Sequence, residues 1–351
     1  MEKEINRIIN FSNAFGPSGM EHSVSKLGLE ECHDICQGYT DTMQNTFLPL
    51  SDTKNPKILL DAHADEVGFI IQAIKNNGSL RFLPLGGWDA KNIISCPVKI
   101  KTNHGYVSGI VASCPVHFLS ENERNKAPNF EDLVIDVATS SKQETLDLGI
   151  QIGDFVVPDV QCVFDAKRKI FMGKAFDCRI GCAALIETLH RLAKEKTKTS
   201  VCGLLSVQEE VGERGMLCAL HKIQPKLAIC FEGCPADDTF SEPYMVQSAL
   251  KKGPMLRYFD RSMITHPTWM QFALEIADRY HIPYQVSVRK GGGTNGGILH
   301  THDIPTIVIG IPTRFAHASV GYCSLEDYEN AVALAVRIVQ HIDEYMQKEK
   351  L

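Results

Sequence analysis

The sequence predicts an α/β fold in which a mostly parallel sheet carries helices on both faces and a small all-β domain is inserted. Short apolar runs that turn polar at their carboxyl ends alternate with helical segments over most of the chain. Between residues 70 and 162 the pattern changes to short alternating segments separated by glycine and proline. We therefore expect residues 1–69 and 163–351 to form the main domain and residues 70–162 to form the insert.

The first expected element is an N-terminal helix. Ile5, Ile8 and Phe11 recur at helical spacing, with charged residues between them. The segment Gly16-Pro17-Ser18-Gly19 then breaks the pattern, because glycine and proline favour turns. A second helix is expected over about residues 21–31.

Four apolar runs are expected to form the buried strands of the sheet. They cover residues 57–63, 201–207, 227–231 and 306–311. Runs of this kind, polar only at their ends, are typical of strands that are buried on both faces. The helices that alternate with them are expected near residues 180–194, 213–222, 267–280 and 325–346.

The insert contains five short segments in which apolar and polar residues alternate. They are residues 79–83, 98–102, 105–111, 133–137 and 154–157. Helix signals are few here, so we expect an all-β unit with its own core. The alternative is a set of hairpins at the edge of one large sheet.

Length and composition narrow the class of protein. At about 150 residues per domain, 351 residues correspond to roughly two domains. Hydrophobic residues make up 44% and charged residues 22%, as in ordinary globular proteins, and the formal net charge is -6. Because an acidic chain does not favour nucleic acid or an anionic membrane as its main partner, a small molecule or a peptide is expected.

The N-terminus and the cysteines indicate a cytoplasmic protein. Residues 1–7 are too charged for the apolar core of a signal peptide, and nowhere do eighteen apolar residues run together. The twelve cysteines form no Cys-x-x-Cys motif, so buried, reduced thiols are expected. The pairs Cys178/Cys182 and Cys230/Cys234 leave a metal site with soft ligands as the alternative.

Side chains that bind hard metal ions lie at or just past the ends of the expected strands. They are His63, Asp177, the pair Glu209-Glu210, Glu232 and His317. In an open α/β sheet the carboxyl ends of neighbouring strands meet at one crevice, so these residues can share a site. Two imidazoles with several carboxylates suit zinc or a similar divalent ion. Taken singly, each has an ordinary explanation, such as a hydrogen-bonded histidine or a solvated turn.

Five motifs follow one another along the chain. They are Asp61-Ala62-His63-Ala64-Asp65-Glu66-Val67-Gly68-Phe69, Phe176-Asp177-Cys178-Arg179-Ile180-Gly181, Gln208-Glu209-Glu210-Val211-Gly212-Glu213-Arg214-Gly215, Gly292-Gly293-Thr294-Asn295 and Ile311-Pro312-Thr313-Arg314-Phe315-Ala316-His317. Together they resemble the glutamyl aminopeptidase family, which includes the tetrahedral aminopeptidases and FrvX-like proteins. The resemblance covers nearly the whole chain, including Gly86-Gly87-Trp88-Asp89 in the insert, and implies a zinc-peptidase-like main domain.

The resemblance implies a site with two divalent metal ions. Asp177 would bridge both ions, His63 and Glu232 would complete one of them, and Glu210 and His317 the other. Zinc is the expected metal, with cobalt or manganese as alternatives, because the same ligands accept all three.

Two further carboxylates receive roles from the resemblance. Asp65 would hold the imidazole of His63 in its orientation. Glu209 would be the general base, which takes a proton from a water activated on the two metals and returns it to the leaving amine. Adjacent residues on an extended segment point in different directions, so only one member of the Glu209-Glu210 pair can face a metal.

The implied activity is that of an aminopeptidase, which removes N-terminal residues from short peptides with a free N-terminus. No nucleic acid and no membrane is expected as a partner. The family also implies a homo-oligomer, a twelve-subunit tetrahedral shell that is assembled through the inserted domain.

Three residues depart from the pattern of the family. Cys178 stands where many relatives have a second Asp after the bridging residue, Glu232 where many have Asp, and Asn295 where an Asp is common. These changes put in question an acidic role at position 178, the placement of the first metal and one negative charge near the site. For Gly291 to Gly297 the alternative is a flexible turn.

Two other functions stay open at this point. A glycoside hydrolase needs only two carboxylates, but it leaves the histidines without a role, and Glu209 and Glu210 are neighbours whereas glycosidase carboxylates flank a sugar bond about 5–10 Å apart. The second alternative is a non-catalytic, metal-stabilised assembly protein, although the presence of Glu209 with all five ligands speaks against it. No function is assigned to His190, His221, His300 or His302.

Overall fold

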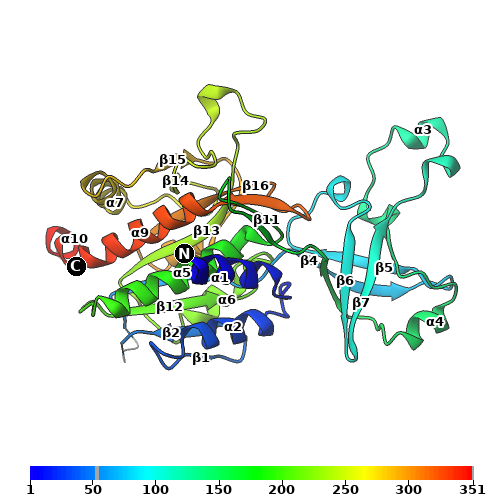
Figure 1. Cartoon of the computed structure of the whole chain (residues 1–351), viewed down its shortest axis with the longest axis horizontal. Helices are drawn as coiled ribbons and strands as arrows, with labels where there is room; N and C mark the ends of the chain where they lie inside the picture. The colour runs from blue at the N-terminus through cyan, green and yellow to red at the C-terminus, as the bar shows by residue number, and fades with distance from the viewer. Residues whose placement is uncertain (52–54, 350–351) are drawn as a thin grey trace.

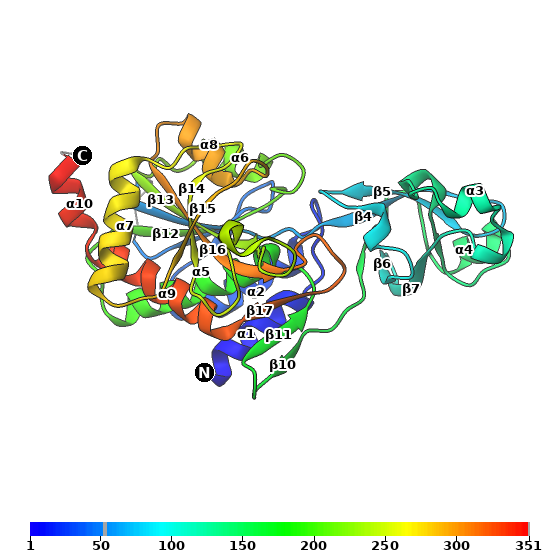
Figure 2. The same ribbon diagram turned by 90° about the horizontal axis from the view of Figure 1, so that it is seen from above.

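Two lobes make up the structure, a computed structural model that describes residues 1–51 and 55–349. Over these residues the larger lobe contains a mixed sheet of eleven strands, and the smaller lobe is a closed barrel of six strands. The barrel projects from one end of the larger lobe (Figures 1 and 2). Both termini lie in the larger lobe, away from the barrel. The predicted fold class, α/β with a small separate β domain, is confirmed.

The centre of the sheet is parallel and consists of the four predicted apolar runs. β12 (Val201–Ser206), β3 (Ile58–His63), β13 (Leu227–Pro235) and β16 (Thr306–Arg314) pair in this order. Every residue of β3 is buried, because helices cover both faces of these strands. Their parallel direction brings their carboxyl ends to the same edge of the sheet.

The parallel pairing predicted for the sheet is found in the central strands and between β14 and β15, whereas the other neighbours are antiparallel. β2 pairs with β12, and β17, β11 and β10 extend the other side in antiparallel steps. Antiparallel neighbours need only short connections, such as the one between β10 and β11, whereas parallel neighbours need long crossovers. The bounds are β1 (Tyr39–Thr40), β2 (Thr46–Pro49), β10 (Val163–Asp165), β11 (Ile170–Gly173), β14 (Met255–Phe259), β15 (Gln285–Val288) and β17 (Gly321–Ser324).

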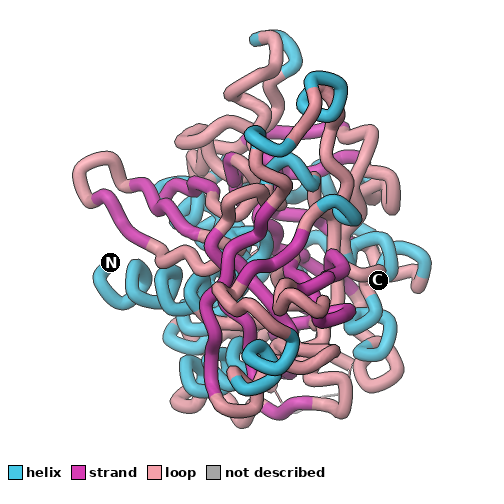
Figure 3. The backbone as a smooth tube through the Cα atoms, turned by 90° about the vertical axis from the view of Figure 1, so that its right-hand side faces the viewer, coloured by secondary structure: helices cyan, strands magenta, loops and turns pink. Residues whose placement is uncertain are grey.

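Helices cover both faces of the sheet, as predicted (Figures 1 and 3). The larger apolar core lies on the face covered by α1 (Glu2–Asn13), α2 (His22–Cys32), α5 (Phe176–Lys194), α7 (Pro267–Arg279), α9 (Leu325–Gln340) and α10 (Ile342–Glu349). On the other face, α6 (Arg214–Ala219) and α8 (Asn295–Thr301) pack in a smaller core. The single helix expected over 325–346 is two helices, because α9 ends at Gln340 and His341 caps it.

The barrel has a core of its own, which excludes a set of hairpins on one large sheet. Its strands close in the order β4-β5-β8-β7-β6-β9 around buried residues such as Phe69, Phe82 and Val98. The strands are β4 (Gly68–Ile74), β5 (Leu80–Leu85), β6 (Pro97–Thr102), β7 (Gly105–Ala112), β8 (Val134–Asp136) and β9 (Phe155–Pro158). Shorter elements are α3 (Glu121–Arg124), α4 (Lys142–Asp147), η1 (Ala90–Asn92), η2 (Val116–Phe118) and η3 (Phe130–Asp132) here, and η4 (Pro243–Met245) in the larger lobe.

A buried ion network lies where the chain leaves the sheet for the barrel. Glu66, between β3 and β4, accepts hydrogen bonds from Lys174 at 2.5 and 2.6 Å and from Arg179 at 3.3 Å. All three side chains are at most 2% exposed. Arg179 also donates to the carbonyls of Phe11, Ala14 and Gly16, so the network ties α1 and α5 to the start of the barrel.

Two of the expectations about compartment can be compared with the structure. No helix among the described residues is long and apolar enough to cross a membrane. All twelve cysteines are free thiols, and nine of them are buried.

Candidate active site

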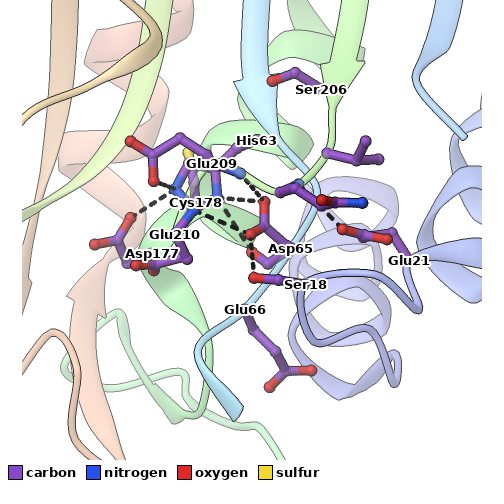
Figure 4. A network of polar contacts seen from close by, with 12 residues as sticks. Ser18, Glu21, His63, Asp65, Glu66, Asp177, Cys178, Ser206, Glu209 and Glu210 are labelled. Carbon is purple, nitrogen blue, oxygen red and sulfur yellow. Dashed lines mark hydrogen bonds and ion pairs between the residues drawn. The ribbon is translucent and has the colours of Figure 1, made fainter. Parts of the chain in front are cut away.

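The predicted site residues meet at the carboxyl edge of the central strands. Figure 4 shows His63, Asp65, Asp177, Glu209 and Glu210 among them. His63 is the last residue of β3, Glu232 lies within β13, and Asp177 lies in the first turn of α5. The pair Glu209 and Glu210 follows β12, and His317 follows β16. Five segments that are far apart in the sequence therefore deliver their side chains to one place, as the strand-end argument predicted.

One group of potential ligands surrounds His63. Its Nε2 atom lies 3.1 Å from Asp177 Oδ1 and 3.6 Å from Glu232 Oε2. One ligand atom each of His63, Asp177, Cys178 and Glu232 lie within 4.8 Å of one another. A single metal ion could therefore be held among them.

A second group surrounds His317. Its Nε2 atom lies 3.3 Å from Asp177 Oδ2 and 3.3 Å from Glu210 Oε1. Asp177, Glu210 and His317 also meet within 4.8 Å. The two oxygens of Asp177 thus face different histidines, which is the arrangement that a bridging carboxylate requires.

Hydrogen bonds at the Nδ1 atoms leave both Nε2 atoms facing the carboxylates. His63 Nδ1 lies 3.2 Å from the carbonyl oxygen of Asp65, and His317 Nδ1 lies 2.7 Å from that of Gly87. A carbonyl can only accept, so each Nδ1 donates, and a ring in its neutral form then has its Nε2 lone pair directed at the carboxylates, where a metal could bind. Gly87 belongs to the insert, so the insert contributes one backbone contact to the second ligand group.

Asp65 organises more of the site than the orientation of His63. Its carboxylate lies 3.4 Å from His63 Nδ1, but it also accepts hydrogen bonds from the backbone amides of Glu209 at 3.0 Å and Glu210 at 3.1 Å. Ser18 donates a third hydrogen bond at 2.6 Å (Figure 4). Asp65 therefore holds the Glu209-Glu210 backbone against the end of β3, and burial of this carboxylate is offset by hydrogen bonds that lower its pKa.

The cluster carries an excess of negative charge. Burial raises the pKa of Glu209 and Glu210, and that of Glu232 to about 8, because these carboxylates are desolvated and lie close to other carboxylates. Burial disfavours the charged form of His317, but Asp177 and Glu210 outweigh it and raise the pKa of His317 to about 11. Several carboxylates beside two imidazoles form a donor set that divalent ions fit chemically.

Backbone conformation also indicates that the site is tightly constrained. Ala175, Gln208, Glu213 and His317 have positive φ angles of 56°, 54°, 51° and 59°. Such angles are costly for residues other than glycine and are concentrated at functional sites. Gly233 adds a close approach, since a Cβ atom there would lie 2.7 Å from the Cα atom of Asp177.

The cluster forms the floor of a cleft of about 470 Å³. Its walls include Glu213, Arg257, Arg289 and residues 291–294 of the glycine loop. The glycine segment is thus part of the cleft and continues into α8, which argues against a merely flexible turn. The two arginines were missed in the sequence, although Arg257, a charged residue within the apolar run of β14, is a usable signal.

The three departures from the family pattern lie close to the cluster. Cys178 is fully buried and donates a hydrogen bond to the carbonyl of Phe231 at 3.0 Å, so it takes no acidic role. Glu232 reaches the first ligand group despite its longer side chain. Asn295 is buried beside β3 and β12, and His300 and His302, which received no function, are exposed at the end of α8.

An α/β sheet with imidazoles and carboxylates gathered at the ends of its parallel strands is an arrangement that suits a metal-dependent hydrolase. The chain belongs to the M42 glutamyl aminopeptidase family, whose model matches residues 45–334. It is therefore a peptidase, a hydrolase that acts on peptides, and the recognition made from the motifs is confirmed.

Relatives of known sequence match along most of their length. The FrvX protein of Escherichia coli K12 is 30% identical over 90% of this chain and 89% of its own. The glutamyl aminopeptidase of Lactococcus lactis is 31% identical over 82% of this chain and 81% of its own. The lysyl aminopeptidase of Pyrococcus furiosus is 27% identical over 93% and 94%, so similar proteins are named for opposite N-terminal charges.

Solved structures share the fold over nearly the whole chain. A TET aminopeptidase from a marine sediment Thaumarchaeota archaeon has a TM-score of 0.96 at 34% identity, and 99% of each chain is covered. The TET1 peptidase of Pyrococcus horikoshii, which can assemble into a tetrahedron or a large octahedral shell, has a TM-score of 0.87 at 28% identity over 96% and 99%. A structure from Thermotoga maritima described as an endoglucanase has a TM-score of 0.78 at 26% identity over 97% and 98%.

Proposed function

We propose that this chain is an aminopeptidase that removes N-terminal residues from short peptides with the help of two divalent metal ions. The observation that carries the proposal is the position of Asp177, whose Oδ1 and Oδ2 atoms lie 3.1 and 3.3 Å from His63 and His317. One carboxylate between two imidazoles, each with a further carboxylate, is the donor set of a two-metal site.

The ligands divide into two sets around Asp177. His63 and Glu232 would hold the first ion with Asp177, and Glu210 and His317 would hold the second. Mixed nitrogen and oxygen donors favour zinc, and they also accept cobalt or manganese. The two ions would lower the pKa of a water in the cleft and polarise the peptide carbonyl.

Glu209 is the proposed general base. Its carboxylate lies at the cluster, with Oε2 4.0 Å from His63 Nε2, and a carboxylate oxygen of Glu209 lies within 4.8 Å of ligand atoms of His63 and Glu210. Burial raises its pKa well above the ordinary value, and a raised pKa suits a carboxylate that accepts a proton from water and returns it to the leaving amine. Asp65 acts through the backbone amides of Glu209 and Glu210 and positions both side chains.

We also propose that the chain works in the cytoplasm as a homo-oligomer, a dodecamer assembled through the barrel. The barrel projects from the larger lobe, so it is free to meet other subunits (Figure 2). Exposed apolar side chains on it, such as Phe118 and Val116, offer contact area.

The two alternatives receive less support. A glycoside hydrolase would leave His63 and His317 without a function, and Glu209 and Glu210 are adjacent in the chain instead of facing each other across a substrate. A non-catalytic assembly protein would not need Glu209 beside the two ligand groups.

Hydrolysis of a tripeptide with a free N-terminus, measured before and after removal of metal with a chelator, tests the proposal. We expect cleavage that is lost on chelation and restored by zinc, cobalt or manganese. A cello-oligosaccharide serves as the control substrate and should stay intact. Cleavage of the sugar, or peptide cleavage that is indifferent to chelator, would contradict the proposal.

A further inference from the structure

Three buried polar side chains form a cluster at one end of the glycine loop. The amide nitrogen of Asn295 donates one hydrogen bond to Asp61 Oδ2 at 2.9 Å and another to Ser206 Oγ at 2.8 Å. The three residues are at most 1% exposed. Both hydrogens of one amide are therefore used inside the protein, on partners from two different strands.

Those two strands deliver the proposed metal ligand and the proposed base. Asp61 lies in β3 two residues before His63, and Ser206 is the last residue of β12, three before Glu209. Ser206 is in register with His63 in the parallel ladder. Asn295 therefore touches the sheet at the level from which the site residues emerge.

The other end of the glycine loop is also anchored. Arg289 donates a hydrogen bond to Asp237 at 2.8 Å, and its backbone amide donates to the carbonyl of Phe259 at 2.9 Å. Between the anchors residues 290–293 are exposed, and a Cβ atom at Gly291 or Gly292 would meet nothing within 4 Å. Thr294, next to Asn295, is buried, and its backbone amide donates a hydrogen bond to Ser262 Oγ at 3.3 Å. Packing against neighbours does not place Gly291 and Gly292, so their position depends on the two ends of the loop.

We propose that Asn295 is a positioning residue, which ties the glycine loop to β3 and β12 and thereby sets the distance between this wall of the cleft and the site. The consequence for peptide binding rests on the proposed function, whereas the placement of the loop does not. An amide is needed because it donates, and Asp61 accepts. A carboxylate at position 295 would face the carboxylate of Asp61, and the pair would have to bind a proton or lose this hydrogen bond.

The test compares the metal-loaded parent with Asn295→Asp, Asp61→Asn and the double variant in which the two residues are exchanged. Asn295→Asp should raise KM for a tripeptide at least ~10-fold, with a smaller change in kcat, because small misplacements cost up to about 100-fold. Deuterium uptake by residues 290–294, measured without substrate, should rise. The exchanged pair again has one amide and one carboxylate. Its KM should therefore return to within about threefold of the parent's, and its deuterium uptake should fall back toward that of the parent.

Thermal unfolding and metal content control for general damage, and Asn295→Ala replaces Asn295→Asp if the latter does not fold. Unchanged deuterium uptake in Asn295→Asp, or in the Asn295→Ala variant that replaces it, would overturn the proposal. So would an exchanged pair that folds like the parent but stays as impaired as Asn295→Asp. A parent that cleaves no peptide would contradict the proposed function alone, because the uptake measurement still decides whether Asn295 positions the loop.

Discussion

Glu209 and Asp177 have different neighbours, so we expect their substitution to affect different properties, the reaction rate and the binding of metal. Asp177 contacts both histidines, whereas Glu209 has only a 4.0 Å approach to His63. A residue that is shared by both ligand groups should decide whether metal binds. A carboxylate that stands beside them should decide whether the reaction proceeds.

Glu209→Gln should remove turnover and leave metal content nearly unchanged. The amide keeps the shape of the side chain but accepts no proton, and loss of a general base typically costs about 10²–10⁴-fold in rate. Peptide hydrolysis and elemental analysis of the same preparation measure both quantities. A variant with more than about half of the parent's activity would remove Glu209 from this role.

Asp177→Asn should lose both metals. A neutral side chain contributes no charge to hold two dications together, and it leaves His63 and His317 without their shared partner. Elemental analysis after gel filtration measures the bound metal, with Glu209→Gln as the matched control. Two full equivalents of metal in Asp177→Asn would show that Asp177 is not the bridge.

At the scale of single residues, the sequence predicted which side chains would meet at the site, but it did not predict all of the hydrogen bonds that orient them. His63, Glu232 and His317 could be found because polar residues at the ends of apolar runs stand out. The role of Asp65 at two backbone amides and the carbonyl of Gly87 at His317 could not be read, because backbone contacts depend on how distant segments are placed.

Between elements, the buried network of Glu66, Lys174 and Arg179 holds the join of the sheet and the barrel. Two cations share one carboxylate there, out of contact with solvent. Desolvation lowers the pKa of Lys174 to about 8 although Glu66 opposes this. The arrangement is stable only while the carboxylate is present, because uncompensated buried charge is costly.

Glu66→Gln should therefore destabilise the protein by about 3–5 kcal/mol. Urea unfolding measures the change. Asp343→Asn is the matched control, since its ion pair with Lys57 at 2.7 Å is exposed and should be worth less than about 1 kcal/mol. Equal losses of unfolding free energy in the two variants would mean that burial of the network makes no additional contribution to stability.

The elements themselves were predictable in the interior and less so at the edges. The four central strands have strong apolar runs, and all four were found. β1 and β10 have only two and three residues and contain exposed side chains, so their periodicity is too short to give a direction or a partner. The split between α9 and α10 was missed because the apolar spacing continues across His341.

On the scale of the whole molecule, the larger lobe carries most of the site, and the barrel contributes one contact to it. The barrel has a separate core, but Gly87 at its base hydrogen-bonds His317. Removal of the barrel would therefore disturb the site as well as the assembly that we propose. Activity cannot report on assembly alone, so the mass of the particle has to be measured directly.

Replacing residues 70–162 with a short flexible linker should lower the oligomeric state. Assembly through the barrel predicts a large particle, a dodecamer, for the parent and a much smaller one for the variant. Light scattering with size exclusion measures both masses, and circular dichroism checks that the larger lobe is still folded. A folded variant that keeps the parent's mass would place the subunit interface elsewhere.

The central claim, that the chain is an aminopeptidase, is tested most directly by one peptide in two forms, with a free and with an acetylated N-terminus. In the proposed site, five protein ligands shared by two ions would leave coordination positions open, and a neutral amine could occupy one. An acetylated nitrogen is a poor ligand because its lone pair is delocalised into the amide, and the misplaced carbonyl should react about 100-fold more slowly. Mass spectrometry should show the free peptide shortened one residue at a time while its acetylated twin persists. Equal cleavage of both, or first cuts at internal bonds, would contradict the account.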